Sequence, residues 1–248
     1  MNFPAILMLG FLPAIVLFAF IYLKDRRQPE PAGKLLKAFF FGVLSIPLTF
    51  VLCAVIELIW PNVYLPGSLM DAAYNAFATA AIPEEAAKLV MLMLVLRNNK
   101  YFNEKLDGIV YAVCVTLGFA AIENVMYLFS SGEDVLFLAI LRAVLSVPTH
   151  FLCGVIMGYF VSLAKFYPAR RTRNIALAFV VPMLAHGLYD CLLMYGSGEG
   201  SSYFAVLFIS VLALCYYMWK VSLRLIREHT QRDLAGEYVV SDGDAAQE

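Results

Sequence analysis

Charged residues are scarce in this sequence, making up 15% of its 248 residues, while 62% are hydrophobic. Soluble domains carry roughly 25% charged residues, so a chain with so little charge is expected to lie in a lipid bilayer. The net charge is −1 and no long basic run occurs, which excludes a nucleic-acid partner because such partners are bound by basic patches. The five cysteines stand in apolar stretches without metal-like spacing, and we assign them no chemistry.

Seven apolar segments are long enough to cross a bilayer, which takes about 20 helical residues. They cover residues 3–23, 36–60, 70–96, 106–129, 135–164, 174–195 and 202–222. The sequence therefore predicts an all-α fold, a polytopic transmembrane helical bundle of about seven helices. Residues 1–227 form one membrane domain, and the polar tail 228–248, with His229, is expected to be disordered and solvated because it cannot bury an apolar face.

Lysine and arginine are absent from the connections near 61–69, 130–134 and 196–201. The opposite helix ends carry Lys24, Arg26, Arg27, Lys34 and Lys37, then Arg97, Lys100 and Lys105, then Lys165, Arg170, Arg171 and Arg173, and finally Lys220, Arg224 and Arg227. Because Lys and Arg near helix ends are retained on the cytoplasmic side, we expect the N-terminus outside and the C-terminal tail in the cytoplasm.

Ionisable residues nevertheless occur inside four predicted helices, where each costs about 2.5–3.5 kcal/mol on insertion scales. They are Glu84, Glu85 and Lys88 on the third helix, Glu123 beside Asn124 on the fourth, Arg142 and His150 on the fifth, and His186 and Asp190 on the sixth. Counted from the cytoplasmic helix ends, most of these groups lie about 18–26 Å deep at 1.5 Å per residue. In a hydrocarbon core about 30 Å thick they form one layer nearer the outer face.

Two adjacent carboxylates, Glu84 and Glu85, are difficult to explain by packing in a membrane helix. A desolvated carboxylate can act as a general base on water, and Lys88 lies one turn away to orient its neighbour. Asp190 lies one turn from His186, a spacing that suits a carboxylate fixing an imidazole tautomer. The alternative is that these residues form ion pairs and hydrogen bonds that only stabilise the bundle.

Three further groups of residues are well explained by a role in helix packing or pairing. Glu123 and Asn124 form either an interhelical hydrogen-bond pair or, in the functional reading, a water-binding carboxylate and an oxyanion donor. Arg142 is expected to snorkel to the outer surface or to pair with Glu57. The spacing Gly154-x-x-x-Gly158 favours close packing of the fifth helix against a neighbour.

Established protease patterns are missing. The sequence contains no zinc-binding HExxH, no serine elbow and no aspartate pair at one depth, because Asp107 lies at the inner edge and Asp190 does not. Carboxylate and histidine chemistry on water remains, with no cofactor expected. Zinc held by Glu84, Glu123, His150 and His186 stays open as an alternative. A proton-coupled transporter or a ligand-binding membrane protein also stays open.

Four motifs in order resemble those of the PrsW family of membrane proteases. They are Pro83-Glu84-Glu85-Ala-Ala-Lys88, Phe119-Ala-Ala-Ile-Glu123-Asn124 with Tyr127, His150-x-x-x-Gly154 and His186-x-x-x-Asp190. The related CAAX prenyl protease and Abi superfamily has Glu-Glu-x-x-x-Arg, Phe-x-x-x-His and His-x-x-x-Asn. Here Lys88 comes one residue earlier than that arginine, Glu123 replaces a histidine and Asp190 replaces an asparagine, so prenyl-protein processing is not expected.

The resemblance implies a glutamate-dependent intramembrane peptidase in a bacterial inner membrane. It also implies a substrate, namely a single-pass membrane protein such as an anti-sigma factor, cut first on the extracytoplasmic side during stress signalling. We accordingly expect catalytic roles for Glu84, Glu85, Glu123, His150, His186 and Asp190, with Lys88 and Asn124 in support.

Overall fold

The computed structural model describes residues 3–25, 28–196 and 203–236, all of them in helices or short connections. Its helices are α1 (Phe3–Lys24), α2 (Ala32–Ile59), α3 (Leu69–Tyr74), α4 (Ile82–Leu96), α5 (Lys105–Ser130), α6 (Val135–Leu141), α7 (Val147–Phe166), α8 (Arg171–Gly196) and α9 (Phe204–Leu234). Arg26, Arg27, most of the 196–201 loop and residues 237–248 of the expected tail lie outside the described residues.

Each predicted span corresponds to one continuous helical segment. α3 and α4 are joined by a π-helical stretch, η1 (Asn75–Ala81), and α6 and α7 by a second, η3 (Arg142–Ser146). Single 3₁₀ turns at Gly132–Asp134 and Pro168–Arg170 precede α6 and α8. Six of these segments are long and apolar enough to cross a membrane. The seventh, the α3–α4 segment with the adjacent carboxylates, is not among the six. The predicted all-α membrane bundle is confirmed.

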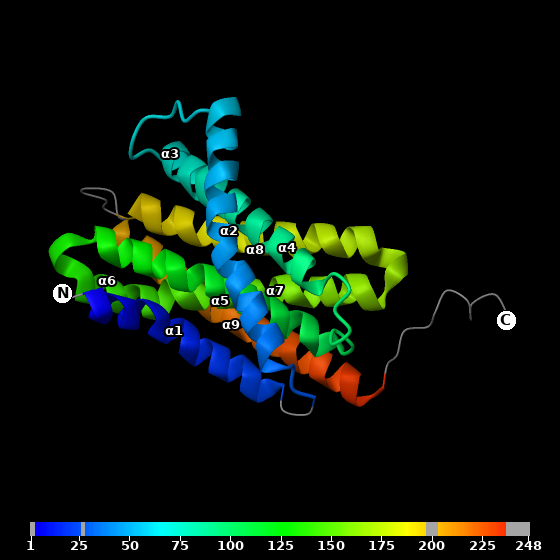
Figure 1. Ribbon diagram of the computed structural model, residues 1–248. Helices are drawn as coiled ribbons and strands as arrows, with labels where there is room; N and C mark the ends of the chain where they lie inside the picture. The colour runs from blue at the N-terminus through cyan, green and yellow to red at the C-terminus, as the bar shows by residue number, and fades with distance from the viewer. Residues whose placement is uncertain (1–2, 26–27, 197–202, 237–248) are drawn as a thin grey trace.

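α5 forms the centre of the bundle, with nearly all of its side chains buried between α1, α2 and α7. In Figure 1 it lies among the other helices while α2 crosses it at a steep angle. The crossing is close: a Cβ on Gly118 would meet the backbone of Phe39 and Gly42 on α2. On the other side of α5, Gly158 of α7 lies against the backbone of Gly108 and Ile109. The predicted close packing of Gly154 and Gly158, both on α7, against a neighbouring helix is confirmed.

α9 is longer than expected, because residues 228–234 continue the helix instead of joining the disordered tail. Asp233 explains the extension, since its two carboxylate oxygens accept hydrogen bonds from the backbone N–H groups of Lys105 and Leu106 at 2.9 Å each. They satisfy donors that the start of a helix leaves without intrahelical partners. His229, expected in solvent, is buried and stacks on Tyr159 with ring centroids 4.3 Å apart.

The alternating helix directions gather the lysine- and arginine-bearing helix ends at one end of the bundle, here called the basic end. Figure 1 shows the ends of α4, α7 and α9 there, opposite the N-terminus. The ionisable side chains inside the helices therefore lie between the basic end and the opposite end.

Candidate active site

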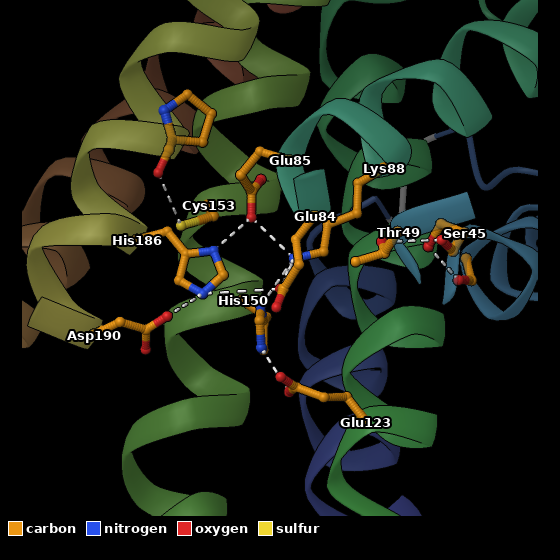
Figure 2. Close-up of polar contacts among 12 residues, drawn as sticks. Ser45, Thr49, Glu84, Glu85, Lys88, Glu123, His150, Cys153, His186 and Asp190 are labelled. Atoms are coloured by element: carbon orange, nitrogen blue, oxygen red, sulfur yellow. Dashed lines mark hydrogen bonds and ion pairs between the residues drawn. The ribbon is translucent and has the colours of Figure 1, made fainter. Parts of the chain in front are cut away.

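Four helices contribute to one polar cluster around Lys88 (Figure 2). Lys88 Nζ lies 3.0 Å from Glu84 Oε2 and 2.9 Å from Glu85 Oε1, both on its own helix α4. It also lies 3.2 Å from His150 Nδ1 on α7 and 4.0 Å from the ring centroid of Phe119 on α5. Lys88 is completely buried, so its ammonium group depends on these partners in place of water.

The partners of His150 indicate its tautomer. A lysine ammonium group only donates hydrogen bonds, so His150 Nδ1 accepts and the ring carries its proton on Nε2. That nitrogen lies 3.0 Å from Glu123 Oε2 on α5, which accepts the proton's hydrogen bond. His150 therefore directs Nδ1 toward the cluster, and the hydrogen bond from Nε2 to Glu123 fixes the orientation of the ring.

His186 on α8 also has a carboxylate behind its ring, but its other nitrogen faces a second carboxylate instead of a lysine. Its Nδ1 lies 2.9 Å from Glu85 Oε1, and its Nε2 lies 3.2 Å from Asp190 Oδ2 one turn further along the helix. The rings of His150 and His186 meet edge to face, with centroids 5.0 Å apart. Carboxylates behind each imidazole fix the ring orientation, the arrangement seen for histidines that act on water or metals.

The two adjacent glutamates differ in their access to the surroundings. The Glu85 side chain is fully buried between Lys88 and His186, whereas that of Glu84 is 11% exposed. Glu84 also lines a cavity of about 360 Å³ between α2 and α5, together with Glu123. A water molecule or a substrate therefore reaches Glu84 first.

Arg142 is part of this site, contrary to the expected pairing with Glu57. Its Nη2 lies 2.6 Å from Glu123 Oε2, its Nε donates to Asn124 Oδ1 at 2.8 Å, and its guanidinium lies over the Tyr127 ring. A signal was available: Glu123 comes seven residues before the end of α5 at Ser130, and Arg142 seven after the start of α6 at Val135. Equal distances from one short turn place the two residues at equal depth.

Asn124 is fully buried and links neighbouring elements. Its Nδ2 donates to the backbone oxygen of Gly10 on α1 at 3.1 Å, and its Oδ1 accepts from Arg142. These are the contacts of the interhelical alternative rather than those of a donor turned toward the cluster.

Glu84, Glu85, His150 and His186 each offer one possible ligand atom, and the four atoms lie within 4.8 Å of one another. Carboxylate oxygens and imidazole nitrogens are ligands for zinc, and Glu85 Oε2 is a buried atom with no hydrogen-bond partner among the described residues. The donor set fits a divalent metal. It contains Glu85 in place of Glu123, which belonged to the alternative zinc set that the sequence left open.

Comparison with known proteins gives a consistent result. Residues 30–216 match the family model described as PrsW family intramembrane metalloprotease. The chain is 34% identical to Protease PrsW of Oceanobacillus iheyensis over 91% of its own length and 98% of the relative's. It is 36% identical to Protease PrsW of Bacillus subtilis over 76% and 83% of the two lengths. Protease PrsW of Clostridioides difficile is 31% identical, over 90% of each chain.

No solved structure shows significant similarity to the chain. The family match covers the helices that carry all the clustered side chains, from α4 to α8. With this match, the curated relatives and six helices able to cross a membrane, the chain belongs to the PrsW family of intramembrane proteases and is a multi-pass peptidase of a bacterial inner membrane.

Proposed function

We propose that this peptidase makes the first, extracytoplasmic-side cut in a single-pass membrane protein, and that an anti-sigma factor of a stress response is its substrate. The observation that carries the proposal is the convergence of Glu84, Glu85, His150 and His186 inside the bundle. The basic end supports the direction, because placing it in the cytoplasm puts the opposite end, toward which the α2–α5 cavity extends, outside.

Glu84 is the proposed general base. Its carboxylate lines the cavity and is more accessible than that of Glu85, which Lys88 and His186 hold in place. Glu84 takes a proton from a water molecule, the hydroxide adds to the peptide carbonyl carbon, and the same proton then passes to the leaving amine. His186 faces carboxylates at both ring nitrogens, so it donates to both only as an imidazolium, and its positive charge rather than a free N–H group then stabilises the oxyanion.

A divalent metal at the same cluster is a second form of this proposal, favoured by the family description and by the donor set. Glu84 or Glu85 would hold the ion with His150 and His186, while Glu123 and Asp190 keep the two rings oriented. Such an ion polarises a bound water or carbonyl. Because Lys88 Nζ contacts three of the four donors, its side chain must withdraw from at least one of them.

The test uses purified protein in liposomes with candidate single-pass anti-sigma factors and compares wild type with Glu84→Gln and His186→Ala. Glu84→Gln is expected to lower kcat by about 10²–10⁴-fold, the usual contribution of a general base. Glu57→Gln, at an exposed position on α2, is the matched control and should cleave like wild type. Cleavage at the wild-type rate by Glu84→Gln would contradict the assignment.

Chelator treatment separates the two forms of the proposal. Loss of cleavage with chelator, recovery with zinc and about one bound metal per chain support the metal form. Full activity in chelator, with no metal in the preparation, supports water activation by the glutamates alone.

A further inference from the structure

Two cavities flank the catalytic cluster and share one residue. The α2–α5 cavity touches Glu84 and Glu123. A second cavity of about 460 Å³, here called the α6–α8–α9 cavity, touches Asp190 and Arg142 on the other side. Tyr127 lines both, with its side chain about half exposed. A chain lying across Tyr127 therefore contacts catalytic carboxylates from both cavities.

Both cavities are lined mostly by apolar side chains. The α2–α5 cavity adds to them the hydroxyl and thiol groups of Thr49, Thr79, Ser130 and Cys53. The α6–α8–α9 cavity is formed mostly by Leu141, Leu145, Leu192, Leu193, Phe204 and Phe208, and its charged groups are Arg142 and Asp190. Its volume lies within the range of about 300–1,000 Å³ typical of ligand pockets. It suits a bulky apolar group rather than an ionised one, because ionised groups are costly to desolvate without a partner.

We propose that the α6–α8–α9 cavity is a specificity subsite that takes a large apolar side chain of the substrate, such as leucine, methionine or phenylalanine, next to the scissile bond. This inference rests on the proposed function. The substrate segment lies extended from the α2–α5 cavity across Tyr127, because a helix would keep its peptide carbonyls in internal hydrogen bonds and away from Glu84. Leu192 on the cavity wall selects the side chain by size.

Variants at Leu192 test the size selection. The probe is a set of synthetic single-span peptides with alanine, leucine, phenylalanine or aspartate placed in turn at each position near the outer end of the span, in liposomes with the full-length enzyme. Wild type is expected to prefer leucine or phenylalanine at one position beside the cut. Leu192→Trp fills the cavity and should lower cleavage of those peptides about tenfold or more, but not that of the alanine peptide. Leu192→Ala should shift the preference toward phenylalanine.

Leu188→Trp is the matched control, because Leu188 lies one turn earlier on the same helix, is 45% exposed and does not line the cavity. It should keep the wild-type preference. If Leu192→Trp and Leu192→Ala leave the preference unchanged while wild type cleaves, the subsite is overturned although the proteolytic function stands.

Photocrosslinking gives a readout that needs no cleavage. A diazirine amino acid of the size of leucine at position 192, in a Glu84→Gln background, should crosslink to the peptide beside its outer span end, whereas the same group at position 188 should not. Equal crosslinking at the two positions, or none at 192, overturns the subsite. If wild type cleaves no peptide but position 192 alone crosslinks, the subsite is supported and the proteolytic proposal is the one that fails.

Discussion

Arg142 lies behind the polar cluster around Lys88, with its guanidinium between the Glu123 carboxylate and the Tyr127 ring. Glu123 Oε2 accepts hydrogen bonds from both Arg142 and His150, so the arginine acts on the site through two successive contacts. We regard it as a positioning residue. Depth counting from the cytoplasmic helix ends placed His150, Glu84 and the other inward-facing groups in one layer, but the pairing of Arg142 with Glu123 follows only when both are counted from the turn that joins their helices.

Replacement of Arg142 tests this positioning role. Arg142→Gln is expected to lower kcat about 10–100-fold, as loss of a contact behind a site histidine typically does, with a small change in KM. Arg142→Lys should restore part of the activity, because it keeps the charge but not the forked hydrogen bonds to Glu123 and Asn124. Steady-state kinetics of cleavage is the measurement, with Arg173→Gln at the exposed start of α8 as the control. An unchanged kcat in Arg142→Gln would remove Arg142 from the site.

The two π-helical stretches come directly before helices that contribute to the polar cluster, α4 and α7. η1 ends just before Pro83 and Glu84, and η3 ends just before Pro148 and His150. A proline has no N–H and crowds the carbonyl four residues earlier, and a π turn, bonded over five residues, absorbs that conflict within a continuous helix. Apolar run length predicted the spans, but a run of apolar residues carries no sign of such a turn.

The spacing of residues after position 222 indicates that α9 continues beyond the membrane span. Ser222, Ile226 and His229 are buried on one face at helical spacing, and Asp233 continues that face. The rising charge after residue 222 suggested the end of a membrane span, which is not the same as the end of a helix.

The close glycine contacts of α5 predict a packing effect. Gly158→Ala places a methyl group against the backbone of Gly108 and Ile109, which cannot move aside as a flexible side chain does. We expect a loss of about 1–3 kcal/mol in unfolding free energy, the usual cost of overpacking. Gly33→Ala, at a position with open space around it, is the control and should be neutral or slightly stabilising. Unfolding of the purified protein in detergent measures both, and equal stability of the two variants would contradict the role of this contact.

On the scale of the whole molecule, the basic end also contains buried acids. Asp25, between α1 and α2, is 2% exposed and accepts a hydrogen bond from the Glu30 backbone N–H at 3.3 Å. The pKa of Asp25 is raised from 3.8 to about 7, chiefly by burial, with that hydrogen bond opposing the rise and the nearby carboxylates of Glu30, Glu104 and Asp233 contributing to it. Ionisation of Asp25 therefore opposes folding.

This raised pKa sets a pH dependence of stability. The folded-state pKa lies above the unfolded value, so the contribution of Asp25 to stability is fully present below about pH 4. This contribution is lost as the pH rises through 7. Asp25→Asn removes the charge and should raise the melting temperature at pH 8, by about 2–4 °C for each kcal/mol recovered. The difference from wild type should shrink toward pH 5. A difference that stays constant from pH 5 to pH 8, measured by thermal unfolding in detergent, would show that titration of Asp25 is not its cause.

Assembly of the site from α4, α5, α7 and α8 has a consequence for translation. When α4 leaves the ribosome, Glu84 and Glu85 are inserted with their own counter-charge, because Lys88 lies three and four residues along the same helix. His186 and Asp190 follow only with α8, the next-to-last long helix. With the roles proposed above, the site therefore stays incomplete until insertion of the nascent chain is almost finished.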